Sequence, residues 1–224
     1  MKQVKGEKVG VIEIPTLNDI CYERIKIQIL DGTISWGERI DIGQVAASFG
    51  VSKFPVIKAI ERLSLEKLVT IVANKGTYVT VPSEKTVNEV TQIRCMIENF
   101  AFSYALDCKR DELERELEKT QQEWNFSGIP FKDIERRDFL RYDRHFHLAI
   151  VMCTGNEQLV SYYRTVRTQI ELFRVKTFTS STVENALEMH AKIVRAVIRG
   201  EKEEAIAALQ EHLGTVNNDI KVTL

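Results

Sequence analysis

The feature that most constrains this 224-residue chain is the order of short segments between Pro15 and Pro82. Thr16 and Asp19 have the spacing of a capping box at the start of a helix, with Asp in place of the usual Glu or Gln. The apolar positions of this helix are Leu17, Ile20, Cys21, Ile25 and Ile29. Their spacing predicts an amphipathic helix, and residues 1–15 are then expected to be a flexible leader.

Two more helices are expected soon after the first. A short one is predicted near residues 42–49, and Gly50 closes it. Ser52 is a favourable N-cap for the next, and Pro55 falls in its first turn, where proline is tolerated. This third helix is expected to run to about Lys67.

The third helix is followed by two β-rich runs, residues 69–73 and 77–81, with turn-forming residues 74–76 between them. This pattern predicts a β-hairpin. Three helices followed by a hairpin are typical of a winged helix-turn-helix, so residues 16–81 are expected to form a DNA-binding domain.

Beyond Pro82 the sequence is helical in period. The six expected segments are 84–108, 111–125, 131–153, 157–176, 182–199 and 202–220. Because the connections are short, neighbouring helices should pack antiparallel in a bundle. The predicted fold is therefore mainly α: a winged helix-turn-helix with a small β-hairpin, followed by an all-α antiparallel six-helix bundle over residues 82–224.

Composition excludes several classes of protein. With 44% hydrophobic and 28% charged residues the chain is typical of globular proteins. It has no apolar run long enough to cross a membrane, and its first ten residues are not expected to be a secretory signal. Its four cysteines are scattered without a Cys-x-x-Cys pair, which indicates free thiols in the cytoplasm. Charge is nearly balanced: residues 1–82 carry 11 basic and 9 acidic side chains, and the remainder 20 and 23.

The third helix is the candidate for reading DNA. In a helix-turn-helix the first turn of the second helix of the motif enters the major groove. The candidate DNA-binding residues are Ser52, Lys53, Phe54, Lys58, Arg62, and Lys75 and Thr77 of the hairpin. Lysines can contact phosphates or guanine edges. The alternative is a solvated helix with ordinary surface lysines.

Four polar side chains fall within the apolar stripes of three helices of the second part. Asp143 and His147 are four residues apart on one helix, and His190 and His212 lie on two others. A buried carboxylate needs a partner, and a divalent metal ion would satisfy all four groups at once. Zinc, nickel and manganese all suit these ligands. Each histidine alone could instead be a hydrogen-bonded core residue, and Asp143 could accept a proton from His147.

Arg94 is a second polar residue within an apolar stripe. A buried guanidinium requires a carboxylate partner. The local candidate is Glu98, one turn away. The alternative hypothesis is an organic acid effector bound between the metal and Arg94, with Arg167 and Arg174 as weaker candidates for the same pocket.

The segment GVSKFPVIKAI, Gly50 to Ile60, resembles the GntR family of bacterial transcription regulators, in particular its FadR subfamily. Ser52 and Lys53 occupy the family's hydroxyl and basic positions. The chain departs from the family at Ile57, where an arginine usually contacts DNA, at Lys58, where the family has Glu, and at Gly43, where many members carry a basic residue. We interpret Lys58 as partly replacing the missing arginine charge.

The second part resembles the FadR-type effector domain, called FCD, through DRHFH (143–147), EMHAKIVRAVIRG (188–200) and QEHL (210–213). The resemblance implies the metal-containing branch with six helices, in which Asp143, His147, His190 and His212 hold the metal. Such domains bind small carboxylates at this place.

Together these observations predict a ligand-responsive transcription regulator that is not an enzyme. It would be a homodimer on double-stranded operator DNA, controlled by a small carboxylate, with no membrane association. One alternative is a metal-dependent hydrolase or lyase that uses the His₃Asp site to activate water. Against it, no further inward base is evident. Another is a metal-binding scaffold that has lost DNA affinity.

Overall fold

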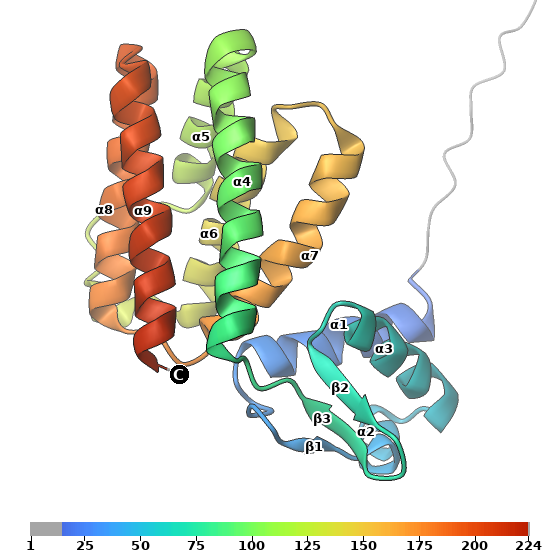
Figure 1. The fold of residues 1–224 in the computed structure, drawn as a ribbon. Helices are drawn as coiled ribbons and strands as arrows, with labels where there is room; N and C mark the ends of the chain where they lie inside the picture. Colours follow the sequence, from blue (N-terminus) through green and yellow to red (C-terminus); the bar gives the residue numbers. More distant parts are fainter. Residues whose placement is uncertain (1–14, 224) are drawn as a thin grey trace, which may run out of the picture.

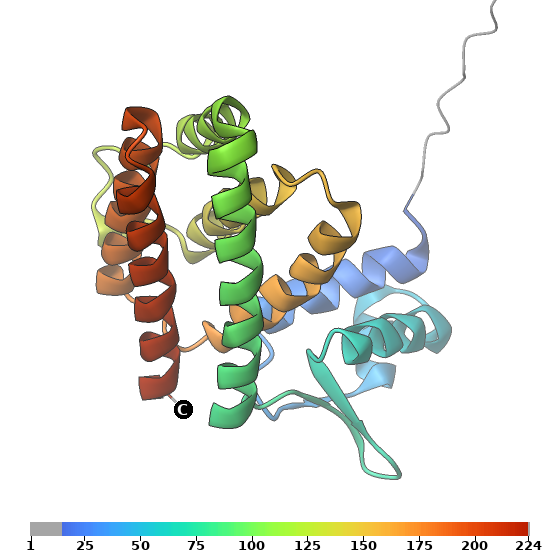
Figure 2. The same cartoon turned by 45° about the horizontal axis from the view of Figure 1, so that its top comes forward.

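The computed structural model describes residues 15–223, so nearly all of the expected leader, residues 1–15, lies outside the described residues. Within this range the chain is mainly helical, with a small sheet in its N-terminal part (Figures 1 and 2). The expected fold class, a winged helix-turn-helix followed by an all-α bundle, is confirmed.

From residue 15 on, the N-terminal part contains three helices and three short strands. They are α1 (Leu17–Leu30), β1 (Arg39–Ile40), α2 (Ile42–Phe49), α3 (Lys53–Leu65), β2 (Val69–Val72) and β3 (Gly76–Val79). The sheet is antiparallel in the order β1-β3-β2. The hairpin β2–β3 was expected from the sequence, whereas β1 was not, because two residues are too few to show a strand period.

The ends of these helices follow local sequence signals. Thr16 and Asp19 form the expected capping box of α1. Gly50 ends α2 with the left-handed backbone that favours glycine (φ 68°). Ser52 is the N-cap of α3, although its side chain makes no capping hydrogen bond. At the start of α1, Leu17 and Ile20 are exposed, so the buried face begins at Cys21.

The C-terminal part is a bundle of six α-helices with one short 3₁₀ turn. They are α4 (Glu84–Cys108), α5 (Arg110–Glu123), η1 (Phe131–Asp133), α6 (Arg136–Met152), α7 (Glu157–Phe173), α8 (Ser180–Arg199) and α9 (Lys202–Thr223). The segment expected as one helix over 131–153 therefore begins as the separate turn η1. Helix α8 begins two residues earlier than expected because Thr179 and Thr182 form a capping box.

An apolar cluster joins the two parts. One cluster fills the bundle, and a second begins among α1, α3 and the sheet and continues into α4, α7 and α9. Arg136, in the first turn of α6, donates hydrogen bonds to the carbonyl oxygens of Leu30 and Asp31 at the end of α1. Helix α1 thus lies against the base of the bundle near α7 (Figure 2).

In the part of the chain that the structure describes, no helix is both long and apolar enough to span a membrane.

Candidate functional site

Helix α6 carries two of the expected metal ligands on its buried face. Asp143 and His147, one turn apart, are both fully buried. His145 lies on the exposed side of the helix, where its Nδ1 is 2.7 Å from the carbonyl oxygen of Arg141. The inward positions of Asp143 and His147 are as the helical period predicted.

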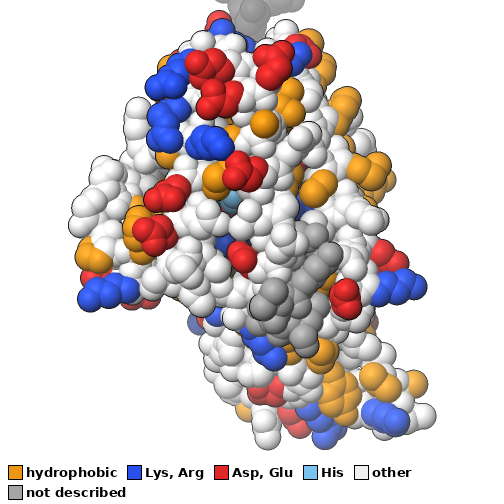
Figure 3. All heavy atoms as spheres, turned by 60° about the vertical axis from the view of Figure 1, so that its left-hand side comes forward, with side chains coloured by type: hydrophobic (Ala, Val, Ile, Leu, Met, Phe, Trp, Pro, Cys, Tyr) orange, Lys and Arg blue, Asp and Glu red, His pale blue; other side chains and the backbone are white. Residues whose placement is uncertain are grey.

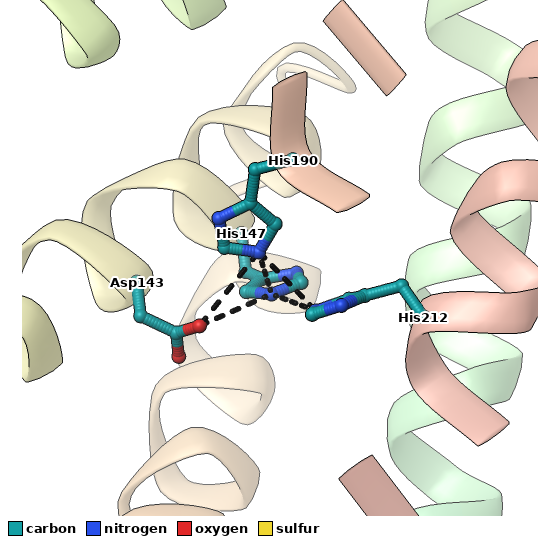
Figure 4. A group of neighbouring side chains, drawn as sticks. All are labelled: Asp143, His147, His190 and His212. Carbon is teal, nitrogen blue, oxygen red and sulfur yellow. Dashed lines mark hydrogen bonds and ion pairs between the residues drawn. The ribbon is translucent and has the colours of Figure 1, made fainter. Parts of the chain in front are cut away.

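His190 from α8 and His212 from α9 meet this pair in the bundle core (Figure 4). The Nε2 atoms of the three histidines lie 3.1–3.3 Å from one another. Asp143 Oδ1 lies 3.7 Å from His190 Nε2 and 3.8 Å from His147 Nε2. One ligand atom from each residue therefore falls within 4.8 Å of the others. The four positions that the sequence singled out form one cluster.

Glu98 on α4 fixes the orientation of His147. Its Oε2 lies 2.7 Å from His147 Nδ1, and its Oε1 accepts a hydrogen bond from the Tyr163 hydroxyl at 2.7 Å. Because a carboxylate only accepts, His147 Nδ1 carries the proton and its Nε2 presents a lone pair to the cluster. A carboxylate behind a histidine is the arrangement that orients histidine ligands in metal sites.

Arg94 lies on the same side of the cluster as Glu98. It is fully buried, and its Nε donates to Glu98 Oε1 at 2.6 Å, so its local partner is present. Its Nη2 also lies 3.1 Å from His147 Nε2. Arg94 therefore contacts both the ligand cluster and the carboxylate that supports it.

Two further arginines bind Asp143: Arg167 lies within α7, and Arg174 is the C-cap of that helix. Arg167 and Arg174 each donate to Asp143 Oδ2, the latter at 2.8 Å. Burial by itself raises the pKa of Asp143, but the charges of Arg174 and Arg167 hold that pKa well below its usual range. Oδ1 has no hydrogen-bond partner within the described residues. Asp143 is therefore an ionised carboxylate with one oxygen left for the cluster.

Burial has the opposite effect on the histidines. Removal from water lowers the pKa of His147, and lowers those of His190 and His212 well below 6.5. All three are therefore neutral imidazoles at pH 7, which is the form that binds metal ions.

The donor set fits a divalent metal ion. Ligand atoms bound tetrahedrally at about 2.0–2.1 Å from zinc lie about 3.3–3.4 Å apart, close to the separations of the three Nε2 atoms. Without a cation, the buried Asp143 Oδ1 has no partner and three imidazole nitrogens compete for protons. Asp143, His147, His190 and His212 could thus hold the ion, which would supply Lewis acidity to a bound ligand.

A narrow opening of about 10 Å³ reaches this cluster between the α7–α8 connection, α8 and α9. His212 and Arg174 line it, together with Thr177, Thr182 and Asp219. Figure 3 shows a histidine side chain at the bottom of a hollow on this face of the bundle. The opening has room for about one water molecule, so a larger ligand requires side chains to move.

Sequence reasoning missed part of this network. Tyr163 and Glu171 on α7 were not singled out, and Glu98 was considered only as a partner of Arg94. Glu171 is buried and accepts two hydrogen bonds from Arg144, at 2.6 and 2.8 Å. The missed signal is that Tyr163, Arg167 and Glu171 recur every four residues along the buried side of α7.

The candidate DNA-binding residues on α3 divide into two groups. Ser52, Lys53, Phe54 and Lys58 lie on its exposed side. Arg62 instead turns toward α1: its guanidinium stacks 3.7 Å from the centre of the Tyr22 ring and pairs with Asp19 at 3.3 Å. The structure therefore separates Arg62 from the residues of the first turn.

The two candidate DNA-binding residues of the hairpin also differ in exposure. Lys75 is exposed in the turn between β2 and β3, which projects away from the bundle (Figure 2). Thr77 is buried, with 6% of its surface exposed, because β3 is the central strand and pairs there with Ile40 and Ile71. The placement of Thr77 thus differs from the expectation of an exposed DNA contact.

A winged helix-turn-helix joined to a helical bundle with a buried metal-ligand cluster defines a class of two-part regulators. The family model for bacterial regulatory proteins of the gntR family matches residues 18–79, and that for the FCD domain matches residues 89–215. The chain belongs to the GntR family of bacterial regulatory proteins, in the group that carries an FCD domain, as the sequence resemblance indicated.

Curated relatives support this assignment. The chain is 30% identical over 203 residues to the HTH-type transcriptional regulator YdhC of Bacillus subtilis (strain 168), covering 88% of this chain and 87% of YdhC. It is 23% identical over 203 residues to the gluconate operon transcriptional repressor of Bacillus licheniformis, covering 88% and 82%. Family and relatives indicate a transcription regulator and do not favour the hydrolase or lyase alternative.

Solved structures show the same fold. A transcriptional regulator GntR from Rhodococcus sp. RHA1 superposes with a TM-score of 0.70 at 19% identity, covering 92% of this chain and 98% of that one. The Zn²⁺-bound FCD domain of TM0439 superposes with a TM-score of 0.53 at 26% identity, covering 63% and 96%. FCD domains can therefore bind metal.

Proposed function

We propose that this protein is a ligand-responsive transcription regulator that binds operator DNA and senses a small organic acid at a divalent-metal site in its helical domain. The observation that carries the proposal is the convergence of Asp143, His147, His190 and His212 in the core of a bundle attached to a winged helix-turn-helix. Zinc, nickel and manganese all suit these ligands. The protein would act in the cytoplasm, where bacterial DNA lies.

The charges around the cluster favour an acid as the effector. Three arginines (Arg94, Arg167 and Arg174) and three carboxylates (Glu98, Asp143 and Glu171) are buried there, so their charges cancel. A divalent cation would then add two positive charges to this buried set. Because buried charge without a counter-charge is unfavourable, an organic acid would complete the site.

Arg94 is the side chain we assign to the acid. His147 Nε2 has one lone pair, so it cannot both accept from Arg94 Nη2 and bind a cation. When His147 serves as a metal ligand, that Nη2 becomes a donor directed at the ligand cluster. Glu98 continues to hold Arg94 through Nε.

A homodimer is supported by an apolar stripe on α4. Its exposed members are Ile93, Met96, Phe100 and Tyr104. Their spacing of three to four residues places them on one side of the helix, and α4 runs along an open face of the bundle (Figure 1). Two copies joined there would present two DNA-binding domains to a two-fold-related operator, as paired helix-turn-helix domains require.

The proposed DNA-binding surface consists of Ser52, Lys53, Phe54 and Lys58 on α3, with Lys75 on the hairpin. All five are exposed, and lysines beside the recognition helix suit phosphate contacts. Arg62 and Thr77 would contact DNA at the edge of this surface only if their side chains turned away from their present neighbours.

The test measures metal content and DNA binding on one preparation. We expect the purified full-length protein to contain about one divalent ion per chain and to bind a preferred duplex selected from a random pool. A panel of small mono-, di- and tricarboxylates should include one that changes DNA affinity about 5- to 150-fold, the usual range of allosteric coupling. His212→Ala should abolish that response, and His145→Ala should leave it unchanged. A response that survives removal of the metal would contradict the proposal.

A further inference from the structure

The first two turns of α3 expose an apolar pair where a DNA-reading helix usually presents polar groups. Phe54 is 62% exposed and Ile57 is 39% exposed. Between and after them Pro55, Val56 and Ala59 are buried in the domain core. The helix therefore has an apolar inner face, as expected, and a second apolar patch on its outer face.

The cations farther along α3 are already engaged within the domain. Lys58 pairs with Glu61 at 2.8 Å, and its ammonium lies 5.8 Å from the centre of the Phe54 ring. Arg62 is held by Asp19 and by the Tyr22 ring. The outer side of the first two turns thus presents Phe54 and Ile57 between Lys53 and the paired Lys58.

Charge around this patch favours nucleic acid as its partner. Lys53 at the start of α3 and Lys75 at the hairpin turn are exposed and carry no ion pair within the described residues. The Ser52 hydroxyl makes no capping hydrogen bond. These groups can contact phosphates on either side of the patch and place it against base edges.

The major groove offers one apolar feature. Thymine carries a C5-methyl group there, whereas the other edge groups of the base pairs are hydrogen-bond donors and acceptors. Phenylalanine and aliphatic side chains can contact that methyl, and the N-terminal residues of a recognition helix are the ones that reach base edges.

We infer that Phe54 and Ile57 are specificity-determining residues that read thymine methyl groups, so that the operator half-site carries thymines opposite the first two turns of α3. This inference rests on the proposed DNA-binding function. At these positions the protein would recognise bases by apolar contact and not by hydrogen bonds. The lysines would supply the part of the affinity that does not depend on DNA sequence.

The experiment removes the methyl group without changing base pairing. The full-length protein is used to select its preferred duplex from a random pool, and each thymine of that duplex is then replaced singly by deoxyuridine. At the thymines opposite α3 we expect affinity to fall about fourfold per methyl group, the usual value of one buried methyl or methylene. Replacing the corresponding thymine in both half-sites of a two-fold operator should lower affinity about fifteenfold. Thymines outside the half-sites should be insensitive.

Protein variants connect this loss to the two side chains. Phe54→Ala and Ile57→Ala should each weaken binding to the thymine duplex and remove the difference between thymine and deoxyuridine at one position. Leu65→Ala is the matched control, because Leu65 is also apolar and exposed but lies in the last turn of α3. Circular dichroism should show that all three variants fold, since none of these side chains is buried.

Equal affinity of the wild-type protein for the thymine and deoxyuridine duplexes overturns this inference and leaves the regulator proposal standing. Failure to select any preferred duplex overturns both.

Discussion

The two parts of the molecule have cores of different chemistry. Among the described residues of the DNA-binding part, Thr77 is the one buried polar side chain, and ion pairs such as Lys26–Glu66 and Lys58–Glu61 lie at or near the surface. The bundle buries many ionisable groups. They are Arg94, Glu98, Asp143, His147, Arg167, Glu171, Arg174, His190 and His212.

This difference shows that buried ionisable groups are not needed to stabilise a fold of this kind. The winged part is stabilised by apolar burial, and its charges stay in water, where they are available to another molecule. The bundle could be apolar throughout, and buried ion pairs are often no more stabilising than hydrophobic residues in the same place. The proposed site for a cation and its ligand would require ionisable groups to be buried there despite the cost of desolvation.

The largest difference should come from replacing one hydrogen-bonded carboxylate in each part, Glu98 in the bundle and Glu66 in the winged part. Glu98 and Glu66 both accept from a tyrosine and a cation, but Glu66 is partly exposed. Glu98→Gln should lower the free energy of unfolding by about 3–5 kcal/mol, because it leaves buried charge uncompensated. Glu66→Gln should cost about 1 kcal/mol or less. Urea denaturation of the metal-free protein measures both. Equal losses would remove the distinction between the two cores.

Metal should stabilise the bundle nearly as much. At a free Zn²⁺ concentration 100 times the dissociation constant, the free energy of unfolding should rise by about 2.7 kcal/mol. His190→Ala should remove most of this gain, because it deletes one of four ligands. His145→Ala, on the exposed side of α6, is the control and should keep it. The measurement is thermal unfolding with and without a chelator, and a gain that His190→Ala leaves intact would place the ion elsewhere.

Acid should weaken the metal-free bundle before it affects the winged part. The buried histidines have pKa values lowered from 6.5, so below pH 6.5 the unfolded chain binds more protons than the folded one. Stability is therefore complete above pH 6.5 and falls as the pH decreases toward the lowered values. The slope should reach at most about 1.4 kcal/mol per pH unit for each histidine. Urea midpoints between pH 7.5 and 5.5 measure it, and a flat profile would contradict the neutral, buried state.

The smallest effects should come from the surface lysines. Lys53→Ala and Lys75→Ala should each weaken DNA binding for all sequences alike and reduce the slope of log affinity against log salt by about 1. Lys58→Ala should do the same if Lys58 supplies charge to the phosphates despite its pair with Glu61. Arg62→Ala should leave the slope unchanged, because Arg62 faces Tyr22 and Asp19. A reduced slope for Arg62→Ala would mean that this side chain turns toward DNA on binding.

The sequence by itself determined the features whose causes are local. Helix starts at Thr16 and Ser52, the stop at Gly50 and the hairpin after α3 each depend on a few neighbouring residues. The inward position of Asp143, four residues before His147, depends only on the helical period. For these reasons the fold class and the inward side of the four polar positions could be predicted.

Only the tertiary structure decided the contacts that join distant segments. Glu98 and Tyr163 are 65 residues apart, and their bond depends on how α4 and α7 pack. The pairing of β1 with β3 buries Thr77, and the packing of α1 on α3 draws Arg62 away from the first turn. Periodicity gives the side of a helix on which a residue lies, whereas its partner depends on the position of every other helix.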